Sequence, residues 1–536
     1  MSYLRRLLGL DAANLDARTG QSLESLESRA MLAADIAVST TNVSNFFDKR
    51  SSADRVQLTV ALTNVGDEAF RGRGNVEFYL STDGTFDSGD ALFATLKVPS
   101  LSAGQRKTLN LNVLEPKDVN PPNGRTALPA GNYAVIARVT GLDDNAANDV
   151  ATASGAVAVN YEFGTGEGGV RVPLTIPLPD GTSITLRISG SGSGNVRNED
   201  GRTIVTLLAG GSRSEFFITT NAKGTSTIQG LEIDDVFKRI VADKINVDGN
   251  IIINGGVGNL SVAGLSNGSL FYTATNFGFF LFQSTIFKLG NVRDAIVSTD
   301  VPINSFDVKS WIDTNGGGDL LSAPSAVSLS SGGDFQPSVS ISSQSVRERL
   351  SLVNVNVKGR VSGSWRLAFG ARKLQFGDVT PDYKATVGGA VDSLYVSGTY
   401  EGLFAATQIN KVFVGRDMRG GTILAGAQLG SDVLLGGTGT GADTYRASTI
   451  NDVQIRGSMI NSLIAAGIRS TDTVFLNADD TFATGTSRIG KIQVYKDVDN
   501  SHFASPSLPA RVRIKFQNNV MTSGNAAFVS TLPIMI

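Results

Sequence analysis

Three carboxylates that could hold a metal ion fall within one short stretch of the chain. Asp83, Asp87 and Asp90 are interspersed with Gly84 and Gly89. Calcium prefers several oxygen ligands on a flexible loop, so these residues form a candidate calcium site, although their spacing is not that of an EF-hand. The alternative is that they cap turns by bonding to nearby backbone groups. The same two interpretations apply to a second acidic stretch, which contains Asp143, Asp144, Asn145, Asn148 and Asp149.

Sugar binding or cleavage is the other chemistry that the residues suggest. Trp311 lies beside a glycine-rich stretch and is the predicted ligand-contacting ring, whereas Trp365 lies in an apolar run and is predicted to be core. Glycoside hydrolysis usually needs two carboxyl groups about 5–10 Å apart. Candidate acids later in the chain are Asp234, Asp235, Asp378, Asp392, Asp417 and Asp452. Such residues usually occupy solvent-facing turns, and we assign no catalytic residue.

The composition excludes several other functions. The 536 residues include no Cys and a single His, His502, so disulfides, thiol nucleophiles, Cys–zinc sites and His–His metal pairs within the chain are excluded. A formal net charge of -2 argues against a nucleic-acid partner, which needs a basic surface. We expect His502 at a surface or turn. No apolar run approaches the ~18 residues of a membrane-spanning helix, the strongest being Phe277–Phe282. An integral helical membrane protein is therefore not expected.

Residues 1–34 differ in character from the rest of the chain and include the run Leu26–Leu32. This run resembles the LEPR-XLL segment near the start of many large secreted planctomycete proteins, with Ser28 in place of the usual Pro and Met31 in place of the first Leu of the pair. The resemblance implies export, and thus a secreted or cell-surface location. The alternative is an amphipathic N-terminal helix.

Residues 35–160 contain several short runs in which apolar and polar residues alternate, separated by turn signals. Such a pattern predicts an immunoglobulin-like β-sandwich. The region resembles the CARDB module, the cell-adhesion-related domain of bacteria, in five pieces that occur in the family's order: Leu62–Gly66, Phe78–Asp90, Leu101–Gly104, Leu128–Tyr133 and Asp143–Asp149. The insert Glu115–Arg125 lengthens one loop. The resemblance implies a secreted binding or spacer module without catalysis.

Residues 240–536 carry a repeat of the form apolar-x-x-apolar-x-apolar, followed by Gly or a turn and a second short apolar run. Copies begin at Val257, Leu352, Ala371, Val391, Ile409, Ile450 and Ile489. A unit of about twenty residues holds two or three short strands, which predicts a right-handed-type parallel β-helix, or solenoid. We expect each Gly after the strand to turn a corner at positive φ. The intervals of 41 and 39 residues after Ile409 and Ile450 are interpreted as two units each. They also leave a propeller as a minor alternative. With its short apolar runs punctuated by Gly, this region resembles the β-helix tails of secreted planctomycete and other bacterial surface proteins.

Two further segments complete the predicted organisation. Residues 161–239 are β-rich and are expected to cap or begin the solenoid. Residues 301–350 break the repeat, with Gly-rich runs at 315–318 and 332–333, and predict a lateral excursion near 310–350. Excursions of this kind are where a ligand is most often bound.

The sequence therefore favours a non-enzymatic extracellular or cell-surface structural or adhesion protein. Its expected partners are glycans or envelope proteins, and calcium is the only cofactor considered. The alternative is a carbohydrate-active β-helix enzyme, a polysaccharide lyase or glycoside hydrolase, with the sandwich as an accessory module. A groove with paired carboxylates and stacked aromatic rings would favour the enzyme, and a shallow face lined by Ser, Thr and Asn would favour the scaffold.

Overall fold

The computed structural model describes residues 34–48, 53–114, 128, 130–140, 147–165, 173–199, 201–273, 283–470, 472–476, 480–507, 511–516, 519–522 and 529–530. These residues form strands, turns and one short 3-10 turn, η2 (Gly439–Gly441), which confirms the all-β class. The chain divides into two compact units, residues 1–115 with 133–157 and residues 116–132 with 158–536.

Several predicted features lie outside the described residues. They are the LEPR-like segment, the insert Glu115–Arg125, the apolar run Phe277–Phe282, and Asp143, Asp144 and Asn145 of the second acidic stretch.

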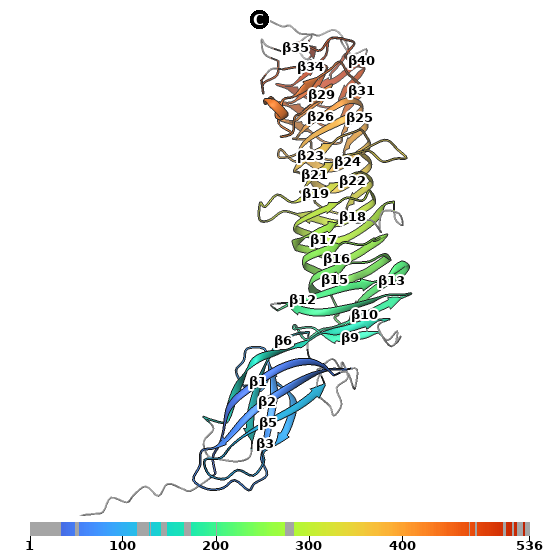
Figure 1. Cartoon of the computed structure of the whole chain (residues 1–536). Helices are drawn as coiled ribbons and strands as arrows, with labels where there is room; N and C mark the ends of the chain where they lie inside the picture. The colour runs from blue at the N-terminus through green and yellow to red at the C-terminus, as the bar shows by residue number, and fades with distance from the viewer. Residues whose placement is uncertain are drawn as a thin grey trace, which may run out of the picture. The chain divides into compact units, whose positions relative to one another are not determined.

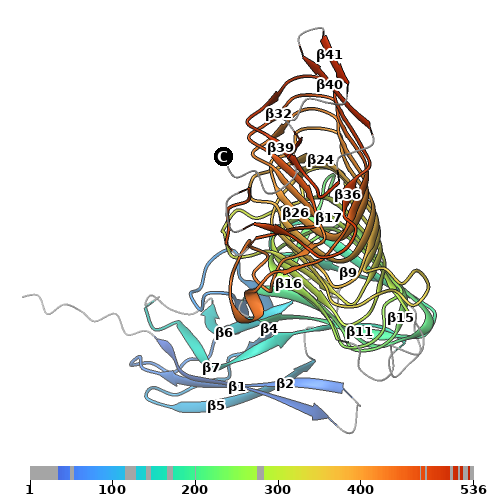
Figure 2. The same cartoon turned by 90° about the horizontal axis from the view of Figure 1, so that it is seen from above.

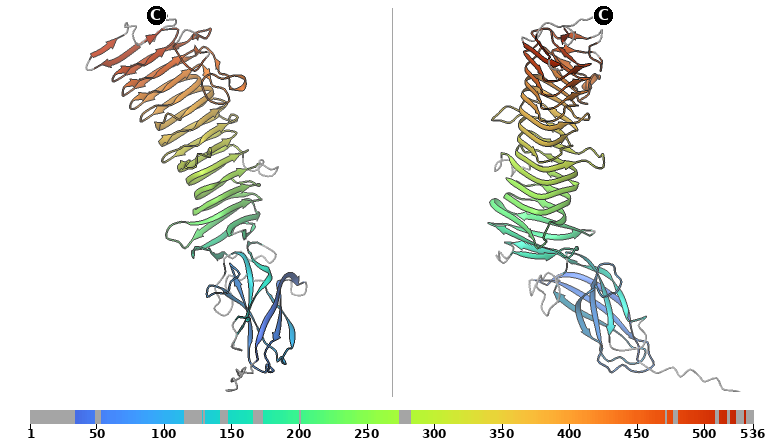
Figure 3. Two further views of the ribbon diagram at one scale, coloured as in Figure 1. Left: turned by 90° about the vertical axis from the view of Figure 1, so that its left-hand side faces the viewer. Right: turned by 180° about the vertical axis from the view of Figure 1, so that it is seen from behind.

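The first unit is a β-sandwich whose strands have hydrogen-bond order β4-β3-β6-β7-β1-β2-β5. Its strands are β1 (Ile36–Asp48), β2 (Ala53–Asn64), β3 (Asn75–Ser81), β4 (Ala91–Lys97), β5 (Arg106–Leu114), β6 (Gly131–Thr140) and β7 (Val150–Val159). Strand β2 pairs antiparallel with β1 and β5, and β3 pairs antiparallel with β4 and β6. Figure 3 draws the strands of this unit in blue to blue-green.

Alternation along the strands builds the core of this sandwich. Val56, Leu58, Val60 and Leu62 of β2 are fully buried, as is Phe78 of β3. Successive side chains of a strand point to opposite faces, so every second residue of the sequence pattern enters the core.

The second unit begins with antiparallel strands. These are β8 (Tyr161–Gly164), β9 (Leu174–Pro177), β10 (Ser183–Ser189), β11 (Ser193–Glu199), β12 (Arg202–Ala209) and β13 (Gly211–Thr220). Strand β10 pairs antiparallel with β9 and β13, and β11 with β8 and β12. From β12 onward the pairing becomes parallel, first to β14 (Ser226–Ile233).

The parallel strands then follow one another as stacked coils (Figures 1 and 2). They are β15 (Phe237–Ile253), β16 (Asn259–Tyr272), β17 (Thr285–Thr299), β18 (Ile303–Ile312), β19 (Leu320–Ala323), β20 (Ala326–Ser331), β21 (Ser338–Ile341), β22 (Leu352–Val361), β23 (Ser364–Leu367), β24 (Ala371–Val379), β25 (Lys384–Val396), β26 (Leu403–Val414), β27 (Met418–Arg419), β28 (Thr422–Ala425), β31 (Thr449–Ile455), β32 (Met459–Ile460), β33 (Leu463–Ala466), β36 (Arg488–Ile489), β37 (Lys491–Val494), β38 (Val498–Asp499), β39 (His502–Ala504), β40 (Arg511–Phe516) and β42 (Val529–Ser530). Strand β41 (Asn519–Thr522) returns antiparallel to β40.

The predicted repeat is confirmed residue by residue. Leu352 pairs with Ala371, Ala371 with Val391, and Val391 with Ile409, so the repeat starts form one column of the sheet. The inward side chains of these copies are almost completely buried. Stacking therefore converts the repeat into continuous apolar ladders, and the parallel solenoid prediction is correct.

The doubled intervals do not contain two units each. Ile409 pairs directly with Ile450, and Ile450 directly with Ile489, so each interval is one coil with an insert. The inserts form the hairpins β29 (Ala427–Gln428) with β30 (Thr444–Tyr445) and β34 (Ile468–Arg469) with β35 (Thr481–Phe482). Leu429, Val433 and Ile468 of the inserts pack in one buried cluster with residues of the coils, including Leu424 and Leu463. The sequence interval alone cannot distinguish an extra coil from such an insert.

The lateral excursion predicted near 310–350 is also wrong over most of its length. Strands β18 to β21 in this range pair parallel with neighbouring coils, and Ala326 lies between Ile303 and Leu352 in the column. The repeat is hard to recognise here because Ser331 occupies a buried position that is apolar in other copies. Only the Gly-rich turn 315–318 and the residues 342–351 leave the ladder.

The glycines that follow the first strand have a different role from the one expected. Gly359, Gly398 and Gly457 are not among the residues at positive φ. Instead, a Cβ on each would overlap the carboxylate of an Asp in the preceding coil, Asp378 in the case of Gly398. The backbone of one coil therefore approaches the side chain of the previous one too closely for any residue but Gly.

We predict that Gly398→Ala lowers the unfolding temperature of the protein by several degrees, because the added methyl group must displace either Asp378 or the backbone. The matched control is Gly224→Ala, where a Cβ would meet nothing within 4 Å. Thermal unfolding followed by circular dichroism measures both. Equal unfolding temperatures for the two variants would show that the close approach is not restrictive.

Candidate functional site

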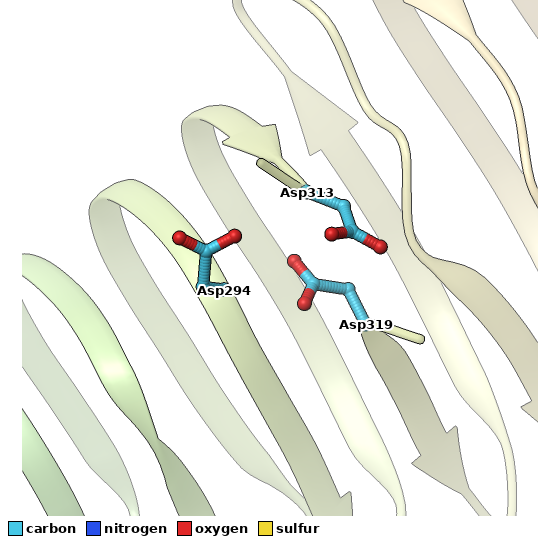
Figure 4. A group of neighbouring side chains, drawn as sticks. All are labelled: Asp294, Asp313 and Asp319. Atoms are coloured by element: carbon cyan, nitrogen blue, oxygen red, sulfur yellow. The ribbon is translucent and has the colours of Figure 1, made fainter. Parts of the chain in front are cut away.

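Three carboxylates from neighbouring coils meet at one edge of the solenoid. Asp294 belongs to β17, Asp313 follows β18, and Asp319 precedes β19. One oxygen from each lies within 4.8 Å of the others, and Figure 4 shows Asp313 and Asp319 turned toward each other. We refer to these residues as the carboxylate triad.

Short local bonds fold the Gly-rich turn onto the preceding coil and bring the triad together. Asp294 Oδ1 accepts a bond from the Thr314 backbone N–H at 2.6 Å, and Asp294 Oδ2 accepts one from the Thr314 hydroxyl at 2.7 Å. Asp313 Oδ1 accepts a bond from the Gly316 N–H at 2.7 Å. Gly316 and Gly318 adopt positive φ, which allows the tight reversal between Asp313 and Asp319.

The members of the triad have different electrostatic surroundings. Asp319 is 5% exposed, and its Oδ2 accepts a bond from Trp311 Nε1 at 2.7 Å. Burial raises the pKa of Asp319 to about 6, with a smaller contribution from the charges of Asp313 and Asp294 and a partial opposing effect of the Trp311 bond. The bonds from Thr314 hold the pKa of Asp294 below its ordinary value. One carboxyl thus retains its proton into mildly acidic solution beside another that ionises readily.

Two chemical properties follow from this geometry. Negative charges this close disfavour simultaneous ionisation of the three carboxyl groups. Clustered carboxylate oxygens are also the ligand type that hard cations prefer.

Trp311 does not provide the exposed ring that the sequence suggested. It is completely buried, and its ring packs against Phe306 and Phe335 at centroid distances of 5.9 and 5.7 Å. The ring therefore cannot serve as a sugar-stacking platform, and its N–H orients Asp319 instead. The prediction of Trp365 as core is confirmed by its full burial. His502 begins β39 at a half-buried position, paired with Leu463.

The predicted calcium residues of the sandwich each bond within their own loop. Asp83 accepts bonds from the Ser81 hydroxyl and the Thr85 N–H, Asp87 from the Gly89 N–H, and Asp90 from the Asp87 N–H. These are the bonds of turn-capping side chains. Asp83, Asp87 and Asp90 are not brought together as the carboxylate triad is. Calcium at this loop stays a prediction. In the second acidic stretch, Asn148 donates to Asp35 at 2.9 Å.

Three of the six candidate acids on the solenoid accept bonds from backbone N–H groups, and two of these acids lie at corners between coils. Asp378 Oδ1 accepts a bond from the Thr399 N–H of the next coil at 2.7 Å, and Asp417 Oδ1 accepts one from the Ser458 N–H at 2.8 Å. Asp334, which the sequence did not single out, does the same for Arg360. Asp235 accepts backbone bonds from Gly210 and Val236.

The remaining candidate acids are in contact with side chains or solvent. Asp234 accepts a bond from the Asn254 amide, Asp452 lies 3.7 Å from Lys491 Nζ, and Asp392 is exposed. The structure thus does not bring these candidates together as a catalytic pair.

The carboxylate triad itself was missed at the level of sequence. Asp294 and Asp313 are 19 residues apart, which is one coil, so extending the repeat through residues 301–350 would have placed them side by side. The position of Asp319 depends on the reversal of the Gly-rich turn, which the repeat does not predict.

No family model and no curated protein matches this chain. Solved structures similar to part of it include the CARDB domain of a Pyrococcus furiosus protein in complex with di-metal ions, with 21% identity, TM-score 0.15, and coverage of 24% of this chain and 94% of that chain. Others are a β-glucosidase involved in saponin metabolism from intestinal bacteria, with 19% identity, TM-score 0.17, and coverage of 24% and 16%, and DesR, a Streptomyces venezuelae β-glucosidase in complex with D-glucose, with 23% identity, TM-score 0.16, and coverage of 24% and 15%.

The chain thus spans about a sixth of each glucosidase, and likeness at this level supports no conclusion about activity. The fold defines an all-β protein that combines a sandwich with a parallel β-solenoid. Among the described residues, no helix has the length and apolar character to cross a membrane.

The raised pKa of Asp319 predicts a pH-dependent stability. The folded state binds the Asp319 proton more tightly than the unfolded chain does, so this stabilisation is complete below pH ~4 and is lost as the pH rises through about 6. In Asp319→Asn the amide oxygen can still accept the Trp311 bond without titrating. We expect the unfolding temperature of the variant, relative to wild type, to increase between pH 4 and pH 7.5.

Differential scanning calorimetry at several pH values measures this difference. Asp497→Asn, at an exposed position, is the matched control for the loss of a carboxyl group. A difference for Asp319→Asn that varies with pH no more than the difference for this control would contradict the assignment.

Proposed function

We propose that this chain is a non-catalytic extracellular or cell-surface scaffold. Its solenoid is a rigid support, and its sandwich is a binding or spacer module. The observation that carries the proposal is the use of the solenoid's acids. Each of three acids accepts a hydrogen bond from a backbone N–H of the next coil through one carboxylate oxygen: Asp334, Asp378 and Asp417. Acids committed to holding the fold are poorly suited to proton transfer with a substrate.

The interior supports the role of a rigid support. Phe287, Phe306, Trp311, Phe335 and Trp365 form a chain of ring contacts with centroid distances of 5.7 to 6.3 Å through successive coils. Interiors packed in this way are resistant to compression, and each added coil extends a parallel sheet by about 4.8 Å. Such an array positions whatever it carries at a fixed distance.

The extracellular location is part of the proposal. It is supported by the resemblance of residues 26–32 to an export-associated segment and of residues 35–159 to a secreted adhesion-related module. Glycans and envelope proteins are the partners that such a location would offer.

A carbohydrate-active enzyme is the second candidate, and the carboxylate triad is the observation in its favour. A carboxyl with a raised pKa beside an ionised one resembles the acid and nucleophile pair of a glycosidase. Against this, Asp319 is 5% exposed and its Oδ2 is bonded to the buried Trp311. The acid therefore offers very little surface to a substrate, so we favour the scaffold.

Incubation of the purified full chain with a panel of neutral and acidic polysaccharides tests the proposal. We expect no new reducing ends and no absorbance of unsaturated uronates at pH 5 to 8. Turnover that is abolished by Asp319→Asn and by Asp294→Asn would contradict the scaffold proposal and support the carbohydrate-active enzyme.

A further inference from the structure

We propose that one outward face of the solenoid binds an acidic, unbranched polysaccharide laid along the solenoid axis. The inference rests on the proposed function as a scaffold and names its ligand class. The face consists of the outward residues of strands β22, β24, β25, β26, β31 and β37, together with residues 456 and 495, and we refer to it as the basic face.

The sheet register places an aromatic and amide column at the centre of the basic face. Gln375 pairs with Tyr395, Tyr395 with Phe413, and Phe413 with Gln454, which pairs in turn with Gln493. All five side chains are partly exposed. Tyr395 and Phe413 stack with centroids 4.5 Å apart and planes 4° apart. The column therefore offers ring edges flanked by amides, which can contact the apolar and hydroxyl parts of a sugar.

A second column beside the first carries positive charge. Lys373 pairs with Ser393, and Ser393 with Lys411, so the two lysines lie two coils apart on the same side of the stacked rings. Two coils of a parallel sheet correspond to about 9–10 Å. Both lysines are exposed. The next residue of the column after Lys411 is Asp452, which lies 3.7 Å from Lys491 Nζ. Lys373 and Lys411 thus offer two positive charges at a spacing that acidic groups along an extended chain can match.

The charge of the whole face is consistent with this ligand. Its basic residues are Lys358, Arg360, Arg372, Lys373, Lys384, Lys411, Arg456 and Lys491, and its acidic residues on the same strands are Asp378, Asp392 and Asp452. Arg372 bonds Glu348 at 2.6 Å, and Lys491 lies 3.7 Å from Asp452. The face is thus basic in a chain whose formal net charge is -2. An acidic partner would be attracted to this side of the solenoid in particular.

The arrangement of the rings favours a polysaccharide over a nucleic acid. Bases bind on open aromatic faces, whereas Tyr395 and Phe413 cover each other's facing surfaces. The Tyr495 ring is covered by Arg456, whose guanidinium carbon lies 4.8 Å from the ring centroid. These rings therefore leave little open aromatic surface on which a base could stack.

Binding of the full chain to alginate, an unbranched polyuronate, tests the inference, with dextran as a neutral polymer and a single-stranded oligonucleotide as another polyanion. Biolayer interferometry at low salt gives the affinities. We expect alginate to bind, dextran not to bind, and the oligonucleotide to bind more weakly. Lys373→Ala with Lys411→Ala should weaken alginate binding about five- to tenfold. The matched control, Lys223→Ala with Lys244→Ala, removes two exposed lysines from other coils and should leave it unchanged.

A second variant tests the aromatic column without disturbing the ladder. Tyr395→Gln with Phe413→Gln continues the Gln side chains already present at 375 and 454. We expect weaker alginate binding at an unchanged unfolding temperature.

Equal alginate affinity for the wild type and the Lys373/Lys411 variant would overturn the inference. Tighter binding of the oligonucleotide than of alginate would also overturn it. Both outcomes would leave the scaffold proposal intact. Cleavage of bound alginate would instead overturn the non-catalytic proposal and leave the binding face in place.

Discussion

The second unit of this protein depends on contact between neighbouring coils. A single coil of about twenty residues has one layer of inward side chains and unpaired backbone groups on both edges, so it cannot be stable alone. Stacking satisfies both requirements, because the backbone of each coil bonds to the next and the inward residues form ladders such as Leu352, Ala371, Val391 and Ile409. The antiparallel strands β8 to β13 supply the first layer on which these ladders grow.

The close stacking of neighbouring coils also restricts which residues can occupy the corners of the solenoid. At each of three corners an Asp carboxylate reaches the next coil, where it accepts a backbone bond, and the residue that it passes must be Gly. At each of these corners the Asp accepts the bond between coils, and the Gly leaves room for its carboxylate. This contact accounts for the paired Asp and Gly at these three corners.

The carboxylate triad and the basic face differ in charge. The triad is compact, and its buried member, Asp319, bonds Trp311 of the interior, whereas Asp294 and Asp313 are half-buried. The basic face is open and repeats with the coils. A surface whose period is set by the backbone suits a polymeric ligand, because the ligand can meet the same contacts on successive coils.

The sequence by itself determined the all-β class, the alternation of the sandwich strands, and the register of the coils from Leu352 to Ile409. These features follow from local periodicity, which any window of the chain displays. Only the tertiary structure decided what lies between the repeats. Spacing could not show that the 41- and 39-residue intervals are single coils with inserts, or that 301–350 continues the ladder with Ser331 inside. It could not show that Trp311 is buried, that Gly398 makes room for Asp378, or that Asp319 joins Asp294 and Asp313. Each of these depends on which residues of different coils become neighbours, and that is fixed by packing between coils rather than by the pattern within one.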